Sequence, residues 1–313
     1  MKKHIPVLLN EVIDGLNLKP NYNVIDTTVG GGGHSQEILK KIGPKGKLIG
    51  IDWDQGAIQR AKENLSAFKD RIYLIRGNYK DFENLLKENK VNLKINGILI
   101  DLGLSMYQLE ERDRGFTFKG NENLDMRYDR DLEKINAEQI LNEFSEGKIA
   151  DIFYQYGEER LSRQIANLIV KRRAQERIDT PEKLVRIIEL IYKSRFKDRS
   201  KKHPATKVFQ ALRIYVNQEF ENIEEFLPKA INTLEKNGRL AVITFHSLED
   251  KIVKEYFKKE ARDCICPIEL PECRCGHKAQ IKIINRKVIT AGIEEIQNNL
   301  ASRSAKLRVI EKN

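Results

Sequence analysis

The chain has 313 residues, 40% of them hydrophobic and 33% charged, which is enough for one large or two ordinary domains with a full core. No apolar run approaches the ~20 residues that span a bilayer, and the acidic Glu11 and Asp14 make the amino terminus unlike a signal peptide. The net charge of +10 and the pI of about 9.2 favour an anionic partner, most often a nucleic acid. The four cysteines are confined to one late stretch, so we expect a protein of the reducing cytoplasm without a membrane partner.

The first expected elements surround a run of four glycines. Apolar residues at helical spacing predict a helix over residues 4–16, and a buried strand over 23–26 precedes Gly30 to Gly33. Glycine permits positive φ angles and lets a ligand lie against the backbone. A strand, a glycine turn and a helix over 36–41 at the carboxyl end of a parallel sheet are typical of a nucleotide-like cofactor site. A glycine loop without a ligand is the alternative.

Three further strands are expected to deliver side chains to the carboxyl edge of the sheet. They cover residues 47–52, 72–76 and 95–102. Asp52 lies 20 residues after Gly32, where an acidic side chain accepts hydrogen bonds from both ribose hydroxyls, and Asp54 is expected to cap the next helix. Tyr79 either stacks on a purine or belongs to the core. Asp101 ends the fourth strand beside the glycine turn.

The alternating pattern stops after the fourth strand, and residues 105–203 contain no clear strand. Helices are expected over 138–144, 148–156, 160–177, 181–192 and 206–220. Residues 158–203 contain 14 Lys and Arg against 7 Asp and Glu, a net charge of +7. A solvated helical face does not explain this imbalance, so we interpret the insertion as a phosphate-binding surface. Its candidate contacts are Arg172, Arg173, Lys201 and Lys202.

A helix over residues 223–236, stopped by Asn237-Gly238, returns the chain to a fifth strand over 239–245. His246 stands at the carboxyl end of that strand. Two final strands, over 280–284 and 305–310, would make seven.

The four cysteines form two C-x-C pairs with six residues between them. They are Cys264, Cys266, Cys273 and Cys275. Zinc is one interpretation, but the pairs are tighter than the usual C-x₂-C spacing. We favour free thiols in a packed loop and assign no metal ligand.

The glycine run itself discriminates between cofactors. A nicotinamide dinucleotide requires G-x-G-x-x-G, and Ser35 stands in the third place. No G-x-x-x-x-G-K-[ST] occurs, which excludes an ATP-binding P-loop. Asp26 and Asp101 would flank the pocket, where two carboxylates repel a pyrophosphate but suit a cation. S-adenosylmethionine fits better, because it offers a ribose to Asp52, an adenine to Tyr79, and a sulfonium and an amino group to the acids.

The sequence resembles the bacterial ribosomal RNA small-subunit methyltransferase H family, also called MraW, from His4 to Val309. The resemblance is carried by HIPVLLNEVIDGL, GGGGHS, IDWDQGAI, ILIDLGLSMYQLEERDRGFTF, LDMRYD, HPATKVFQALRIYVNQE, VITFHSLEDKIVK and SRSAKLRV. It implies an α/β fold: a Rossmann-like class I S-adenosylmethionine methyltransferase with an inserted all-helical domain. We expect the methyltransferase domain to comprise residues 1–108 and 206–313, and the RNA-binding insertion residues 109–205.

The resemblance also implies a reaction, namely S-adenosyl-L-methionine-dependent methylation of N4 of a cytidine in the decoding region of 16S ribosomal RNA. The partner would be 16S rRNA within the small ribosomal subunit. The family's cofactor-binding positions correspond to Gly32, Gly33, His34, Asp52, Tyr79, Asp101 and Gln108. Tyr79 stands where many members have phenylalanine, and stacking survives that change. Ser105-Met106 replaces the more usual Ser-Ser, and Leu300-Ala301 replaces Pro-Arg.

Two residues are candidates for a catalytic role. The exocyclic amine of cytosine is a weak nucleophile, because its lone pair is delocalised into the ring. Asp101 is placed to accept an N4 proton, with the carbonyls of Leu102 or Gly103 as helpers, although it could serve in cofactor binding alone. His246 could contact the base or position the loop. The target cytidine is expected to leave its stack before reaction.

Two other function classes remain open at this point. A non-catalytic RNA-binding ribosome assembly factor could retain the cofactor pocket, although the intact Gly32, Gly33, Asp52 and Asp101 argue against it. A DNA amino-methyltransferase shares the chemistry, but no [DNS]-P-P-[YFW] follows the fourth strand. Oligomeric state, and the choice between naked RNA and an assembled subunit, stay open.

Overall fold

The computed structural model describes residues 5–104, 114–118, 120–130, 134–195, 203–267, 270 and 272–313. The chain divides into two compact units, Met1–Gly103 with Phe220–Asn313, and Leu104–Glu219. The predicted insertion, 109–205, therefore differs from the second unit mainly at its carboxyl end, where the unit continues to Glu219. Among the helices of the described residues, none is both long and apolar enough to cross a membrane.

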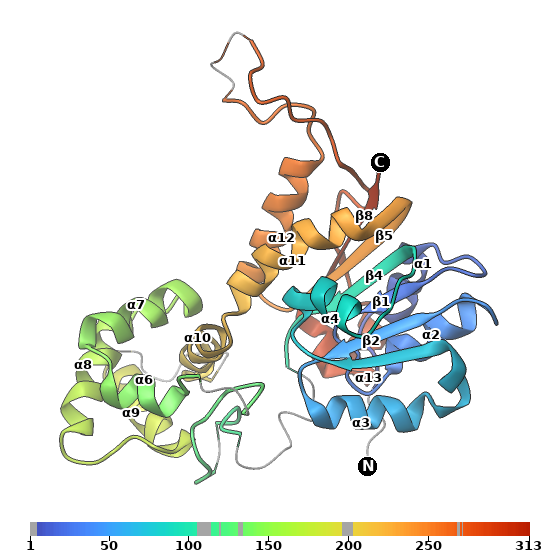
Figure 1. The fold of residues 1–313 in the computed structure, drawn as a ribbon. Coiled ribbons are helices and arrows are strands. Elements are labelled where there is room, and N and C mark those ends of the chain that lie inside the picture. The colour runs from blue at the N-terminus through green and yellow to red at the C-terminus, as the bar shows by residue number, and fades with distance from the viewer. Residues whose placement is uncertain are drawn as a thin grey trace. The chain divides into compact units, whose positions relative to one another are not determined.

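The first unit is built on an eight-stranded sheet with the order β3-β2-β1-β4-β5-β8-β6, and β7 pairs with β8 (Figure 1). Strands β1 to β5 are parallel, whereas β8 runs antiparallel to β5, β6 and β7. The strands are β1 Val24–Asp26, β2 Leu48–Asp52, β3 Ile72–Arg76, β4 Ile95–Asp101, β5 Leu234–Thr244, β6 Ile281–Ile283, β7 Ile289–Thr290 and β8 Lys306–Lys312. The order reverses between β1 and β4, so a crevice for a ligand is expected beyond their carboxyl ends.

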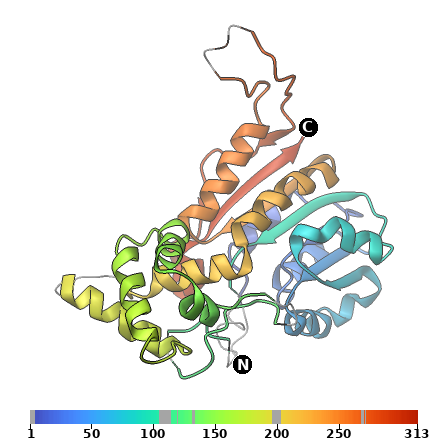
Figure 2. The same cartoon turned by 60° about the vertical axis from the view of Figure 1, so that its left-hand side comes forward.

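Helices cover both faces of this sheet (Figure 2). One face carries α1 Leu9–Leu16, α2 Gly33–Lys41 and α3 Gln55–Asn64, and the other carries α4 Phe82–Glu88, α11 Glu219–Thr233 and α12 Ser247–Glu260. Within β4 the side chains alternate between the two cores, since Ile98 and Ile100 pack with Phe226 and Leu99 packs on the opposite face. A short α13 Ile293–Asn298 and 3-10 turns at Ser66–Arg71, Tyr79–Asp81 and Leu300–Ser304 complete the unit. The α/β class predicted from the alternating pattern is confirmed.

The junction between α11 and β5 differs from the prediction. The helix ends at Thr233 rather than at Lys236, and β5 begins directly at Leu234. Leu234 pairs with Ile95, and the register then shifts before the regular pairing resumes. Asn237 has a φ of 62° and so lies within this irregular stretch. The Asn-Gly pair therefore marks a bulge in a strand rather than the end of a helix.

The second unit is helical in its described part. Its helices are α6 Ala137–Glu143, α7 Glu146–Gly157, α8 Ser162–Arg173, α9 Pro181–Arg195 and α10 Thr206–Asn217. Asn136 forms a capping box with Gln139 at the start of α6. Helix α10 packs on α7, which is why this helix lies within the second unit rather than at the predicted return to the sheet.

The crossing of α7 and α10 depends on a glycine. A Cβ at Gly157 would meet the backbone oxygen of Lys207 and would lie 3.1 Å from Ala211 Cβ. We expect Gly157→Ala to lower the free energy of unfolding of the full chain by about 1–3 kcal/mol, because the two backbones must separate. Chemical denaturation followed by circular dichroism measures this loss. Gly147→Ala in the same helix is the control, since nothing lies within 4 Å of its Cβ position, and an equal loss there would contradict the packing argument.

Candidate functional site

The glycine turn between β1 and α2 is shaped by backbone conformation and by close packing. Gly30 and Gly32 have φ angles of 51° and 82°, which disfavour other residues, and Gly32 is the N-cap of α2. A Cβ on Gly33 would lie 2.5 Å from Pro6 Cγ. The segment before α1 therefore lies directly against this turn. No pattern in the sequence indicates that contact.

Asp52 connects the end of β2 to the glycine turn. Its Oδ2 accepts a hydrogen bond from Gly30 N at 2.9 Å, and its Oδ1 accepts one from Asp54 N at 3.0 Å. Burial raises the pKa of Asp52 to about 7, with smaller contributions from the charges of Asp54 and Asp26. Each oxygen keeps a lone pair for a further donor. Asp54 caps α3 by accepting from Gly56 N, as predicted.

Asp101 ends β4 with one oxygen unsatisfied. Its backbone N donates to Thr28 Oγ1 at 2.7 Å. Among the described residues its buried Oδ1 has no hydrogen-bond partner, and its Oδ2 lies 4.0 Å from His34 Nδ1. Burial raises the pKa of Asp101 to about 8, and the charges of Asp26 and Glu249 add to the rise. This carboxyl group is therefore suited to pair with a cation, and no described lysine or arginine supplies one.

His34 does not supply that cation. Its Nε2 lies 2.9 Å from the carbonyl oxygen of Val7, so Nε2 carries the proton and Nδ1 faces Asp101. Burial lowers the pKa of His34 to about 4, although the Val7 carbonyl opposes the shift. A neutral imidazole therefore anchors the amino-terminal segment beside the glycine turn.

A third acidic group, Asp26, lies at the end of β1 between the other two strands. Ser35 Oγ donates to Asp26 Oδ2 at 2.6 Å. The serine that replaces the third glycine of the dinucleotide motif thus holds the Asp26 carboxyl group in place. Burial raises the pKa of Asp26 to about 6, while the bonds from Ser35 and Thr28 oppose the shift. Three carboxyl groups thus lie at the adjacent ends of β2, β1 and β4. Such a cluster repels a pyrophosphate and suits a cationic ligand.

Tyr79 lies in the core rather than on an open surface. It is 6% exposed, and its ring packs edge-on against Trp53 at 6.1 Å and Phe226 at 5.5 Å between centroids. Trp53, which directly follows Asp52, is only partly buried. We did not single out this residue from the sequence, although an aromatic side chain directly after the acidic residue was a usable signal.

His246 and Glu249 are joined at the start of α12. His246 is the N-cap, and the two residues form a capping box in which Glu249 N donates to His246 Nδ1. Glu249 is 1% exposed and accepts from Phe245 N at 2.9 Å. Its charge contributes to the raised pKa of Asp101. The capping-box spacing could have identified Glu249 from the sequence.

The two predicted RNA contacts that the structure describes, Arg172 and Arg173, differ in their exposure and hydrogen bonds. Arg173 Nη1 donates to the carbonyl oxygens of Leu141 and Phe144, at 2.8 and 2.6 Å, so it satisfies the end of α6. Arg172 is exposed. Other predicted positions lie outside the described residues, namely Gln108, Lys201, Lys202 and the Ser105-Met106 pair.

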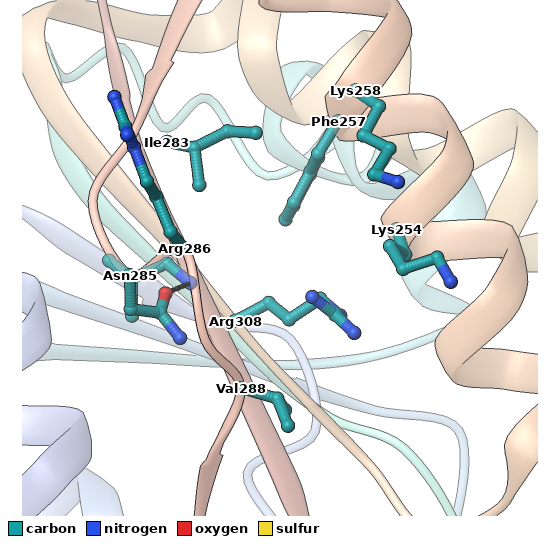
Figure 3. A pocket seen from close by; sticks show the side chains of 9 residues that line it. Lys254, Phe257, Lys258, Ile283, Asn285, Arg286, Val288 and Arg308 are labelled. Carbon is teal, nitrogen blue, oxygen red and sulfur yellow. Dashed lines mark hydrogen bonds between the residues drawn. The ribbon is translucent and has the colours of Figure 1, made fainter.

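A second concavity lies on the first unit, between α12 and the strands β6 and β8. This cavity of about 430 Å³ is bordered by Lys254 and Lys258 on the helix and by Arg286 and Arg308 on the other side (Figure 3). No acidic side chain is among its lining residues, although Arg308 donates to Asp250 at 2.7 and 3.0 Å. Phe257 forms part of the apolar wall. Within the described ranges, neither lysine has an acidic partner. Sequence reasoning missed this basic pocket, because three separate segments contribute to it.

Comparisons with known proteins find similar sequences over essentially the whole chain. The model of the MraW methylase family matches residues 1–313. Ribosomal RNA small subunit methyltransferase H of Heliobacterium mobile is 46% identical over 309 residues, which cover 99% of this chain and 98% of that protein. The protein of the same name from Clostridium botulinum (strain Loch Maree / Type A3) is 46% identical over 310 residues and 99% of both chains. That of Finegoldia magna is 43% identical over 310 residues, 99% of this chain and 98% of the relative.

Proposed function

Because the chain belongs to the MraW methylase family over its whole length, we propose that it methylates N4 of a cytidine in the decoding region of 16S ribosomal RNA. The methyl donor is S-adenosyl-L-methionine. The observation that carries the proposal is the group of three carboxyls, Asp26, Asp52 and Asp101, at adjacent strand ends beside a glycine turn. The names of the relatives support an RNA of the small ribosomal subunit as the substrate.

The residues present fit this cofactor. The buried Oδ1 of Asp101 lacks a donor among the described residues, and the amino group of the cofactor is a suitable one. Asp52 retains acceptor capacity for ribose hydroxyls while the backbone of Gly30 and Asp54 holds it in place. The partly buried Trp53, which packs edge-on against the core residue Tyr79, supplies aromatic surface near the end of β2 for the adenine.

When bound, the cofactor would supply an electrophilic methyl group on a sulfonium, and the thioether that leaves is neutral and needs no acid. The protein must therefore align the nucleophile and exclude water. Asp101, once ionised, accepts a hydrogen bond from the exocyclic amine and directs the nitrogen lone pair towards the methyl group. It then takes the amine proton that is lost as the N–C bond forms and the C–S bond breaks. Glu249 is a positioning residue, since it holds the backbone of Phe245 and the ring of His246 at the end of the adjacent strand. His246 is proposed to contact the base from there.

Transfer of tritium from labelled S-adenosylmethionine to isolated 16S rRNA, and to small ribosomal subunits, tests this function. We expect label in cytidine, and none when the RNA of the large subunit is supplied. Tight RNA binding without any transfer of label to either form of the substrate would contradict the proposal and favour an assembly factor that retains the cofactor pocket.

We propose that the basic pocket contributes to holding the RNA, alongside the basic helical insertion with its exposed Arg172. Lys254→Glu with Lys258→Glu is expected to weaken 16S rRNA binding at least about tenfold and to reduce the slope of log affinity against log salt by about 2, because two phosphate contacts are lost. Filter binding at several salt concentrations measures both quantities.

The matched control reverses two exposed lysines at the end of α2, Lys40→Glu with Lys41→Glu, which changes the net charge equally. A similar loss in both double variants would show that only net charge matters, and would remove the specific role of the pocket.

A further inference from the structure

The loop that joins α12 to β6 brings all four cysteines of the chain together. Their Sγ atoms lie within 4.8 Å of one another. Cys264 and Cys273 are separated by 3.4 Å, Cys273 and Cys275 by 3.6 Å, and Cys264 and Cys275 by 3.8 Å. The loop projects from the sheet (Figures 1 and 2). Two C-x-C pairs from its two arms thus converge on one point.

The three separations among Cys264, Cys273 and Cys275 are close to those of a tetrahedral metal site, and Cys266 Sγ lies within 4.8 Å of the other sulfurs. Four sulfurs about 2.3 Å from a central zinc ion are about 3.8 Å apart, whereas a disulfide requires about 2.05 Å. A cluster of several iron ions would need its sulfurs further apart. Backbone N–H groups also point at the sulfurs: Cys266 N donates to Cys264 Sγ and Arg274 N to Cys266 Sγ, both at 3.4 Å, and Ile265 N to Cys275 Sγ at 3.5 Å. Such bonds stabilise thiolate ligands.

The described residues of this loop make few other contacts. Ala279 N donates to Asp263 Oδ1 at 3.3 Å, and His277 Nε2 lies 3.9 Å from Glu260 Oε2. Between residues 261 and 280, none of the residues that the structure describes is buried, and none belongs to a helix or strand. The apolar Ile265 and Leu270 are 38% and 42% exposed. Without a hydrophobic core, a loop of this length needs a covalent or metal cross-link to hold one conformation.

We propose that Cys264, Cys266, Cys273 and Cys275 bind one structural Zn²⁺ ion. Four Zn–S bonds form, four thiol protons are released to solvent, and no group is oxidised or reduced. Four protein ligands close the coordination sphere, so the ion orders the loop rather than taking part in methyl transfer. This site is independent of the proposed function of the carboxyl cluster.

Elemental analysis of the full-length protein, purified in reductant without chelator, tests the proposal. We expect about one zinc per chain, and none in the Cys273→Ser, Cys275→Ser double variant. Glu272→Gln, which changes a neighbouring exposed side chain in the same loop, should retain the metal. Replacement by Co²⁺ should give the intense visible bands of a tetrahedral tetrathiolate.

Removing the ion should also change the loop without unfolding the core. Trypsin should then cleave the full-length protein after Arg262 or Arg274 at least about tenfold faster, while binding of S-adenosylmethionine is retained. Retained binding in the double variant also excludes a general failure to fold. A chain that contains no zinc and cannot be loaded with Zn²⁺ under reducing conditions would overturn the proposal, and so would iron in place of zinc.

Discussion

The Asp101→Asn variant is expected to lose both cofactor affinity and turnover. The amide cannot carry the charge that pairs with the amino group of the cofactor, so the affinity for S-adenosylmethionine should fall about 10- to 100-fold, as for loss of a hydrogen bond to a charged group. The amide is also a weaker acceptor for an N4 proton, so single turnover at saturating cofactor should fall by ~10²–10⁴-fold. Equilibrium binding and single-turnover transfer to 16S rRNA measure the two effects separately.

The two measurements distinguish the two roles of Asp101. Weak binding with a normal rate at saturation would mean that the side chain is a cofactor ligand only. Asp14→Asn, which neutralises an exposed carboxylate on α1, is the control and should leave both quantities unchanged. Because Asp101 lies between β1 and β5 in the sheet, circular dichroism should confirm that the asparagine variant keeps its fold.

Cofactor affinity should rise with pH up to about pH 8. In the free protein, burial and the charges of Asp26 and Glu249 raise the pKa of Asp101 to about 8. The cationic amino group of the cofactor binds the ionised carboxylate of Asp101. Below the pKa of Asp101, binding must therefore release a proton. The affinity then falls at most about tenfold for each pH unit per titrating group. Asp52, with its pKa raised to about 7, adds to the slope below pH 7. His34 stays neutral throughout, since burial lowers its pKa to about 4.

Titration calorimetry between pH 6 and 9, in buffers of different ionisation enthalpy, measures the affinity and the protons released. The Asp101→Asn variant should lose the part of the slope nearest pH 8. A wild-type affinity that does not change over this range would contradict the electrostatic description of the site.

The same shifts determine how the stability of the free protein depends on pH. The folded state holds protons on Asp26, Asp52 and Asp101 above pH 3.8, whereas the unfolded chain has lost them. Below the unfolded pKa of 3.8 these groups are protonated in both states and do not change the free energy of unfolding. Above it, the free energy of unfolding falls as the pH rises towards about 8. Saturating cofactor should reduce this decline, because it supplies the missing positive charge.

The sheet was largely predictable, because buried parallel strands are continuous apolar runs ended by polar residues. That pattern placed Asp52 and Asp101 correctly at strand ends and Asp54 at a helix N-cap. Irregular features were not predictable. The two-residue β7 is too short for any periodicity, and the bulge at Asn237 carries the same Asn-Gly signal as a helix end.

Side-chain partners within the site depend on contacts between distant segments, which periodicity does not encode. Pro6 against Gly33 and Val7 bonded to His34 join the amino-terminal segment to the glycine turn. Tyr79 could stack or be buried on sequence grounds, and only packing against Phe226 places it in the core. The convergence of the cysteine sulfurs is equally a result of the path of a loop, since C-x-C spacing alone favours no metal.

The central claim is that this chain methylates N4 of one cytidine in the decoding region of 16S rRNA. Mapping of modified nucleotides in 16S rRNA, from cells that express the wild-type chain, the Asp101→Asn variant or neither, tests it most directly. We expect an N4-methylated cytidine in the decoding region with the wild type, and its loss in the other two. The same modification pattern in all three, or a methyl group that appears on a different atom or in a different RNA, would contradict it.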